Sequence, residues 1–260
     1  MEPITVKRLM ADYGCCVIIP TYNNASTIAA VIESVLAYTS DVFVVNDGAT
    51  DTTPLVIEGY RNRVQVVSYS VNRGKAYALR QGFLAARKAG FKYAITIDSD
   101  GQHFAKDIEL FISKLNEGDR IVWVGSRFLT QENMPKKNTF ANKFSNFWFA
   151  LQTLNRLPDT QSGYRLYPLV SVAKIKLFGY RYEGELELLV RLAWRGVKAK
   201  PLPISVYYAP EGERVSHFRP TKDFFRISVL NTFLTILAFV YGYPSMLFYS
   251  IKRKLSRKGL

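Results

Sequence analysis

Cysteine and histidine are both scarce in this chain, which has 2 residues of each kind among 260. The cysteines are neighbours, Cys15 and Cys16, inside an apolar run, so they cannot link distant parts of the chain and no disulfide framework is expected. This usage is typical of a reduced, cytosolic setting. The sequence also lacks zinc-finger spacing and the aromatic signature of RNA-binding domains, so we expect no nucleic-acid partner.

Two kinds of glycine-rich phosphate loop are missing as well. No G-x-G-x-x-G follows the first apolar run, and no G-x-x-x-x-G-K-[ST] occurs anywhere, which argues against dinucleotide-binding and P-loop cradles. Residues 1–14 hold no apolar core, so no secretory signal is expected before Cys15. Acidic residues are outnumbered, 21 against 35 basic ones, and the formal net charge of +14 favours an anionic partner.

What the sequence does contain is an alternation of strand and helix patterns. Short apolar runs indicate buried strands at 15–20, 42–45, 64–69 and 93–97. Helical spacing of apolar residues predicts helices between them, with Ser26 as candidate N-cap of the first, Asp51 or Thr52 of the second, and residues 76–89 as the third. This order predicts an α/β fold built on a single, mostly parallel mixed sheet flanked by helices.

Each expected strand is followed by a polar loop. The carboxyl ends of parallel strands meet at one edge of the sheet, where α/β proteins bind their ligands. We therefore expect four segments to lie together at that edge: Pro20-Thr21-Tyr22-Asn23, Asp47-Gly48, Asn72-Arg73-Gly74-Lys75 and Asp98-Ser99-Asp100.

The loop after the fourth expected strand is the most informative. Side chains at i and i+2 of an extended segment share a face, so Asp98 and Asp100 can reach one divalent cation. A cation held there can bridge the phosphates of a nucleotide-sugar and neutralise the departing diphosphate. A solvated acidic loop is the alternative for an isolated Asp-x-Asp, and the other polar loops at the same edge favour the metal site.

Six sequence motifs, taken in order over roughly residues 14–208, resemble those of one enzyme family. They are V-I-I-P-T-Y-N, V-V-N-D-G-A-T-D, N-R-G-K-A-Y-A-L, D-S-D-G-Q-H, G-S-R and S-G-Y-R-L-Y. Together they resemble the inverting family-two glycosyltransferases, and within them the dolichyl-phosphate mannose synthase and polyprenyl-phosphate glycosyltransferase branch. This resemblance implies a GT-A fold, a UDP- or GDP-linked sugar donor, and Mg2+ or Mn2+ as cofactor.

The resemblance also implies roles for individual residues. Asp47 matches the acid that recognises the donor's base or ribose, although the branch commonly shows Asp-Asp-Gly where this chain has Asn46-Asp47-Gly48. The metal-binding group is Asp98, Asp100 and Gln102, an oxygen set suited to Mg2+ or Mn2+. Asp98 also counts among the donor-binding candidates, and the others in this half are Pro20, Thr21, Tyr22, Asn23 and Lys75.

Three residues are candidates for the catalytic step: Asp100, Arg165 and Glu185. Glu185 lies where many family-two enzymes keep an Asp that deprotonates the acceptor, so it can act as a general base. If the acceptor is a lipid phosphate that is already ionised, no strong base is needed, and Glu185 would orient the acceptor or bind metal. For Lys75 and Arg165, an ordinary solvated position is the alternative to a role in the site.

Residues 209–220 resemble the loop that closes over the donor phosphates in relatives. Those relatives often show Arg-x-x-Gly-x-Ser-Lys, whereas alignment on Ser216 puts Glu211 at the Arg position and His217 at the Lys position. Arg214 then becomes the candidate phosphate contact, and His217 a further candidate for the metal or the diphosphate.

The C-terminal part has a different character. Residues 227–251 contain no charge, and Gly242-Tyr243-Pro244 is expected to break this run into helices too short to span a bilayer. We expect two helices at the membrane interface, with a helix pair packed on the domain as the alternative. The aromatic residues expected among the headgroups are Phe224, Phe225, Phe233, Phe239, Tyr241, Tyr243, Phe248 and Tyr249, and the tail expected on anionic lipid is Lys252, Arg253, Lys254, Arg257 and Lys258.

The sequence thus predicts a glycosyltransferase domain at 1–220 and membrane-interface helices at 221–260. The predicted activity is metal-dependent, inverting transfer of a sugar from a nucleoside diphosphate to a lipid-linked acceptor at the cytoplasmic face of a membrane. A nucleotidyltransferase is the first alternative, disfavoured because the first strand is not followed by a triphosphate loop. A non-catalytic adaptor that keeps the fold is the second. The sugar, the base, the lipid and homo-oligomerisation stay open.

Overall fold

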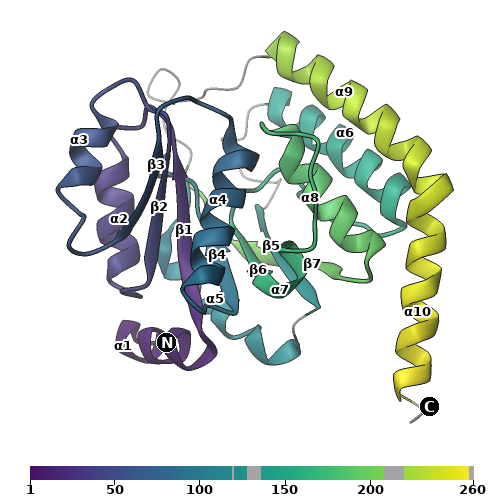
Figure 1. Cartoon of the computed structure of the whole chain (residues 1–260), viewed down its shortest axis with the longest axis horizontal. Helices are drawn as coiled ribbons and strands as arrows, with labels where there is room; N and C mark the ends of the chain where they lie inside the picture. Colours follow the sequence, from purple (N-terminus) through teal and green to yellow (C-terminus); the bar gives the residue numbers. More distant parts are fainter. Residues whose placement is uncertain (119, 128–135, 208–219, 258–260) are drawn as a thin grey trace.

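The computed structural model describes residues 1–118, 120–127, 136–207 and 220–257 of the chain. Its centre is a seven-stranded sheet with the strand order β3-β2-β1-β4-β6-β5-β7 (Figure 1). Neighbouring strands are parallel except for β6, which is antiparallel to β4 and to β5. The mixed, mostly parallel sheet is therefore confirmed. Its strands are β1 (Cys15–Thr21), β2 (Val42–Asp47), β3 (Gln65–Tyr69), β4 (Tyr93–Thr96), β5 (Ile121–Arg127), β6 (Arg165–Pro168) and β7 (Lys198–Ile204).

The register of the parallel strands explains why polar loops share one edge. Thr21 at the end of β1 lies opposite Asn46 of β2, and Asp47 at the end of β2 lies opposite Tyr69 of β3. Because these strands run in one direction and end at nearly the same level, the loops that follow them leave from the same edge.

Helices cover both faces of the sheet, which is why its central strands are apolar throughout. Alternate residues of β1 point to opposite faces of the sheet and so belong to different cores. Cys16 and Ile18 belong to the first core, and Val17 and Ile19 belong to the second. The first core lies under α4 (Lys75–Lys88), α6 (Lys136–Thr153), α7 (Leu169–Val172) and α8 (Glu183–Trp194). The second lies under α1 (Pro3–Tyr13), α2 (Ile28–Leu36), α3 (Thr53–Glu58) and α5 (Ile108–Ile112). One 3-10 turn (Ala105–Asp107) precedes α5, and another (Leu115–Glu117) follows it.

The predicted helix caps are only partly right. α2 begins at Ile28 after Thr27, and its first turn forms no side-chain cap, so the prediction for Ser26 is wrong. The Asn24 carbonyl accepts from the Thr27 and Ile28 N–H groups and opens the helix instead. At α3 the Asp51 carboxylate accepts from the N–H of the first helical residue at 2.9 Å, as an acid before a helix favours.

The C-terminal segment forms one continuous helix with a bend. α9 (Pro220–Leu237) runs through a π-helical turn (Ala238–Gly242) into α10 (Tyr243–Arg257). The predicted break at Gly242-Tyr243-Pro244 is therefore wrong, because the wider turn accommodates a proline that has no N–H to donate. Among the described residues, Phe225–Leu255 is the one helix long and apolar enough to cross a membrane, and 22% of its most apolar window is buried.

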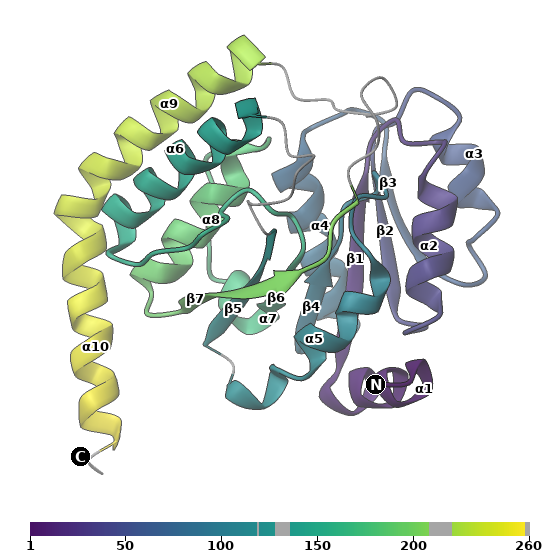
Figure 2. The same ribbon diagram turned by 180° about the vertical axis from the view of Figure 1, so that it is seen from behind.

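This long helix packs on the body along the side away from α2 and α3, as Figures 1 and 2 show. Leu234 and Ala238 are fully buried in the first core. The side-chain amide of Gln152 in α6 donates to the backbone carbonyl of Asn231 at 3.1 Å. The backbone carbonyl of Gln152 accepts from the Trp194 indole N–H at 2.7 Å. One face of α9 thus belongs to the folded core.

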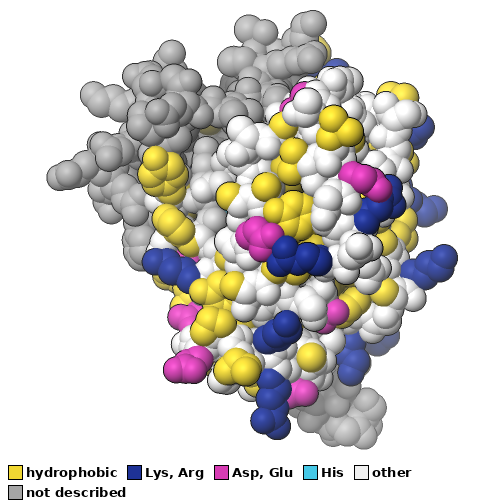
Figure 3. Space-filling view, turned by 90° about the vertical axis from the view of Figure 1, so that its left-hand side faces the viewer, with side chains coloured by type: hydrophobic (Ala, Val, Ile, Leu, Met, Phe, Trp, Pro, Cys, Tyr) yellow, Lys and Arg dark blue, Asp and Glu magenta, His cyan; other side chains and the backbone are white. Residues whose placement is uncertain are grey.

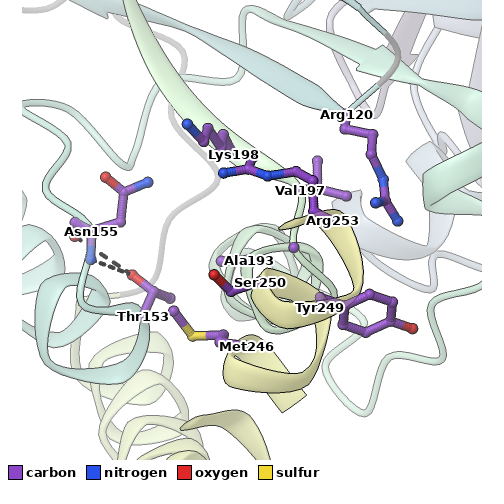
Figure 4. Close-up of a pocket in the computed structure, with 11 residues that line it drawn as sticks. Arg120, Thr153, Asn155, Ala193, Val197, Lys198, Met246, Tyr249, Ser250 and Arg253 are labelled. Carbon is purple, nitrogen blue, oxygen red and sulfur yellow. Dashed lines mark hydrogen bonds between the residues drawn. The ribbon is translucent and has the colours of Figure 1, made fainter. Parts of the chain in front are cut away.

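α10 approaches the body at the turn between α8 and β7. A Cβ atom on Gly196 would lie 2.9 Å from the Tyr249 Cβ, so a glycine permits this contact. A pocket of about 160 Å³ remains beside it, bordered by Arg120, Lys198 and Arg253 (Figure 4). Two of the aromatic residues expected among lipid headgroups face this body instead: Tyr249 packs here, and the Tyr243 hydroxyl donates to the Leu151 carbonyl.

Candidate active site

Side-chain hydrogen bonds tie together the loops that follow β1, β2 and β4. Asn23 Oδ1 accepts from the Thr50 N–H at 2.8 Å, and Asn24 Nδ2 donates to Ser99 Oγ at 2.7 Å. Thr27 Oγ1 donates to the Ser99 carbonyl at 2.6 Å. These bonds hold the segment of the two aspartates against the loop after β1, as expected for loops that share an edge.

Lys75 lies between two carboxylates at this edge. Its Nζ is 2.7 Å from Asp98 Oδ1 and 2.9 Å from Glu185 Oε2. Lys75 begins α4, Glu185 lies in the first turn of α8, and Asp98 follows β4, so three elements supply one charge each. Burial lowers the pKa of Lys75, but the negative charges of Asp98 and Glu185 outweigh burial and raise that pKa well above its usual value. The structure therefore joins three sequence candidates in one charged cluster.

Gly163 leaves the room that this cluster needs. A Cβ atom on Gly163 would lie 2.5 Å from Asp98 Oδ2 and 2.6 Å from Lys75 Nζ. Thr96 Oγ1 donates to the Gly163 carbonyl at 2.6 Å and holds that segment against β4. The S-G-Y-R motif thus needs a glycine for steric reasons, because a larger residue would displace the ion pair of Asp98 and Lys75.

Asp100 is an acid at this edge that has no cationic partner among the described residues. Its Oδ1 accepts from the Gln102 N–H at 3.0 Å. Burial and the negative charge of Asp98 raise the pKa of Asp100 to about 6. A positive charge beside Asp100 would stabilise its ionised form.

The donor set at this edge fits a hard divalent cation. Asp100 and the Gln102 amide offer oxygen ligands, the kind that Mg2+ and Mn2+ prefer. Within 1–118, 120–127, 136–207 and 220–257, no group of three or more His, Cys, Asp or Glu side chains could hold a metal ion. An ion here would take most ligands from phosphates and water, as Mg2+ commonly does.

Asp47 accepts hydrogen bonds from the loop that leads from β3 into α4. Its Oδ1 accepts from the Tyr69 hydroxyl at 2.8 Å and the Arg73 N–H at 2.9 Å. Its Oδ2 accepts from Asn72 Nδ2 at 2.9 Å and the Gly74 N–H at 2.8 Å. Four donors fill a carboxylate that has about four acceptor positions. Asp47 therefore shapes the loop that leads into Lys75, and its contact with the donor's base or ribose stays a prediction.

Arg165 is also a positioning residue. Its side chain is fully buried, and its guanidinium donates to the Ser162 and Thr160 carbonyls at 2.7 and 2.8 Å. It donates further to the Tyr167 hydroxyl at 2.9 Å and the Glu185 carbonyl at 3.2 Å. Arg165 thus fastens the loop before β6 to the start of α8. Its burial contradicts the solvated alternative, and its predicted catalytic role stays a prediction.

Two features of the site were not predicted from the sequence. His103 is packed against Tyr164 with ring centroids 5.2 Å apart, and burial lowers its pKa to about 4, so it is neutral near pH 7. Its position directly after the D-S-D-G-Q motif was the available signal. Arg127 at the end of β5 donates to Asp159 through Nε at 2.6 Å and Nη2 at 3.0 Å. No local pattern marks Asp159.

The remaining candidate residues lie in β1, in the loops at the sheet edge, or outside the described residues. Pro20 is buried inside β1, and Thr21 is buried with a hydroxyl that has no hydrogen-bond partner within the described ranges. Tyr22 and Gln102 are half-buried at the edge, where the Gln102 carbonyl accepts from the Tyr207 N–H at 2.8 Å. Arg214 and His217 lie outside the described residues, so their predicted roles stay predictions.

Comparisons with known proteins agree with this architecture. The profile of the family described as "Glycosyl transferase family 2" matches residues 16–178. The glycosyltransferase AglJ of Haloferax volcanii is 32% identical over 212 residues, which cover 80% of this chain and 67% of AglJ. The dolichyl-phosphate beta-glucosyltransferase of Saccharomyces cerevisiae is 24% identical over 77% of this chain and 68% of its own. The polyprenol monophosphomannose synthase of Mycolicibacterium smegmatis is 25% identical over 75% of this chain and 76% of its own.

Solved structures show the same fold. Glucosyl-3-phosphoglycerate synthase of Mycobacterium tuberculosis, crystallised with Mn2+, UDP and phosphoglyceric acid, has a TM-score of 0.65 to this chain. The two are 19% identical, and the match covers 92% of this chain and 81% of that chain. At this identity the likeness concerns the fold, and it confirms the GT-A architecture that the motifs predict.

Proposed function

Because this chain belongs to glycosyl transferase family 2, we propose that it moves a sugar from a nucleoside-diphosphate sugar to a lipid phosphate, with inversion at the anomeric carbon. Two of the relatives support a lipid acceptor, since their names specify dolichyl phosphate and polyprenol monophosphomannose. The chain is a glycosyltransferase by family and by its named relatives, so the nucleotidyltransferase and the adaptor are set aside.

The observation that carries this proposal is the cluster of Asp98, Lys75 and Glu185 beside Asp100. Asp98 is already neutralised by an ammonium 2.7 Å away, whereas Asp100 has no such partner in the described chain. Asp100 is therefore the better anchor for a metal ion, with Gln102 beside it. When bound, Mg2+ or Mn2+ would supply charge that neutralises the diphosphate leaving group.

Lys75 supplies a second, permanent positive charge at the same edge. Held by two carboxylates, its ammonium cannot swing away, so it offers a preorganised contact for a phosphate group. The Glu185 carboxylate is mostly buried, with Oε2 2.9 Å from Lys75. We assign Glu185 to holding Lys75, because an ionised lipid phosphate attacks without losing a proton and needs no general base.

The proposed location is the cytoplasmic face of a membrane, with residues 221–260 as the membrane-contacting part. Large apolar side chains are exposed along the C-terminal helix, among them Phe239, Val240, Phe248 and Ile251. In contrast, Figure 3 shows a face on the α2 and α3 side where apolar, basic and acidic side chains are interspersed. An exposed apolar stripe on a helix that ends in basic residues suits an anionic bilayer surface.

The test is a transfer assay with defined partners. Purified protein receives radiolabelled UDP- or GDP-sugars, a polyprenyl phosphate in detergent, and Mg2+ or Mn2+, and the label in the organic phase is counted. We expect transfer from one nucleotide class, abolished by a chelator and by Asp100→Asn. Asp12→Asn, at an exposed position of α1, is the matched control. Failure of every donor to label the lipid phosphate, or full activity of Asp100→Asn, would contradict the proposal.

A further inference from the structure

A larger cavity lies on the α4 side of the sheet, and one end of it lies beside the charged cluster. Its volume is about 350 Å³, within the range of small-molecule sites. Three helices border it: α4, α7 with the segment that follows it, and α8, which lie together in Figure 1. Nothing in the proposed transfer uses this space.

The floor of the cavity is apolar and its rim is cationic. Leu79, Phe83 and Leu188 are at most 5% exposed and form part of the floor. Four exposed basic residues stand around the rim, and the described residues provide no ion pair for any of them: Arg80, Arg87, Lys174 and Lys176. Glu185 is the one acid that lines the cavity within the described chain, and Lys75 already neutralises it.

A close helix contact marks the end of the cavity that faces the charged cluster. A Cβ atom on Gly184 would lie 2.5 Å from the Ala76 Cβ, so α4 and α8 touch at the inner end. Glu185 belongs to both sides, since it lines the cavity and its Oε2 contacts Lys75. Its Oε1 is buried without a hydrogen-bond partner among the described residues. The cavity therefore ends one side chain away from the cluster.

We propose that this cavity binds an anionic amphiphile, with an apolar chain on the floor and a phosphate or carboxylate head at the basic rim. A hydrocarbon chain that enters an apolar cavity is stabilised by about 25 cal/mol for each Å² of apolar surface that is removed from water. Four unpaired cations around one opening favour a negative head group. A neutral hydrocarbon chain would interact favourably only with the apolar floor, and a small anion only with the cationic rim.

Isothermal titration calorimetry with four probes tests the site: decyl phosphate, decanoate, decanol and inorganic phosphate, each below its aggregation limit. We expect decyl phosphate or decanoate to bind at least tenfold more tightly than decanol, and inorganic phosphate to show no saturable binding. The stronger of the two anionic probes distinguishes a phosphate lipid from a fatty acid as the natural source. Equal affinity for decanol would overturn the role of the rim, and saturation by inorganic phosphate would overturn the role of the floor.

Variants locate the binding in this cavity. Ala173→Phe fills the space from an exposed position, and the double reversal Lys174→Glu with Lys176→Glu removes the rim charge. Each should weaken decyl phosphate binding at least tenfold, whereas Lys88→Glu, an exposed reversal on α4 outside the cavity, should leave it unchanged. Wild-type affinity in both cavity variants would place the ligand elsewhere. Because the readout is binding alone, failure of sugar transfer would leave this result intact.

Discussion

Lys75 is the residue on which the charged cluster depends. Replacing it with Gln leaves Asp98 and Glu185 without their cation in a mostly buried setting, which destabilises the fold by about 3 kcal/mol. Urea unfolding at pH 7 measures this loss. Transfer activity should fall in parallel because the preorganised positive charge at the edge is gone.

A second variant separates these two effects. In the double variant Lys75→Gln with Glu185→Gln, one of the two uncompensated charges is removed, so part of the lost stability returns. Activity should stay low, since no ammonium has been restored. Recovery of activity together with stability would mean that Lys75 acts only on the fold.

Gly163 offers a steric test of the same cluster. Gly163→Ala places a methyl group within 2.6 Å of both Asp98 and Lys75, so the ion pair must shift. A misplacement of about 1 Å at a catalytic group can lower turnover by about a hundredfold. Gly59→Ala is the control, because the φ of Gly59 is −62°, which any residue adopts, and its Cβ would meet only the Val56 carbonyl oxygen, at 3.4 Å. Equal activity of both variants would show that the geometry around Asp98 tolerates displacement.

Residue roles were the least predictable part of this molecule. The motifs identified Asp98 and Lys75 as candidates, the family resemblance implied Glu185, and strand alternation indicated that Asp98 and Lys75 share an edge. Their contact with Glu185 depends on how α8 packs against α4, a tertiary contact that no local pattern reveals. The hydrogen bonds of Asp47 could not be predicted, because its partners come from the next strand and loop, and only the strand register brings them to its carboxylate.

At the scale of elements, Asp159 joins β5, α6 and the loop before β6. Its carboxylate is fully buried and accepts from Arg127, from Asn142 Nδ2 at 2.7 Å and from the Gln161 N–H at 3.1 Å. Burial raises the pKa of Asp159, but the hydrogen bonds and charge of Arg127 outweigh burial and hold the pKa below its usual value. A carboxyl whose pKa is lowered by folding stabilises the native state above its unfolded pKa, about 3.9, and loses that effect as pH falls through the native pKa.

This linkage gives a pH-dependent prediction. Asp159→Asn should lower the free energy of unfolding by about 3 kcal/mol at neutral pH, because buried donors lose a charged acceptor. The difference from wild type should be the same at pH 6.5 and pH 5 and should shrink at pH 3.5, as measured by urea unfolding. A difference that stays constant down to pH 3.5 would show that the charge of Asp159 is not what holds these elements.

The C-terminal helix shows where element prediction from sequence stops. Its apolar run and its basic end were readable, but a Gly-Tyr-Pro sequence usually ends a helix, and here a π-helical turn carries the chain past Pro244. Packing decides this outcome, because Gly242 lies against the Trp194 indole, where a Cβ atom would come within 2.5 Å. The sequence could not show that one face of α9 is committed to the core.

On the scale of the whole molecule, many of the exposed large apolar side chains lie along the C-terminal helix. The α/β layering follows from the alternation of strands and helices, and it was predictable because both faces of the sheet are covered. The orientation of the C-terminal helix toward a membrane depends on which of its faces the body occupies. Deleting the helix is a poor test of that orientation, since Leu234 and Ala238 belong to the core and their loss would unfold the chain.

Surface substitutions on α10 test the membrane interface without touching the core. Phe248, Ile251 and Leu255 are about half exposed or more, and replacing all three by Ser removes about 1.5 kcal/mol each of apolar insertion, so vesicle binding should fall at least a hundredfold in flotation. Ile4→Ser with Leu55→Ser, exposed on α1 and α3, is the control and should bind as wild type. High salt should weaken wild-type binding only in part, because it screens the basic end but not the apolar face. Wild-type flotation of the triple variant, or resistance of the full chain to carbonate extraction, would contradict an interfacial helix.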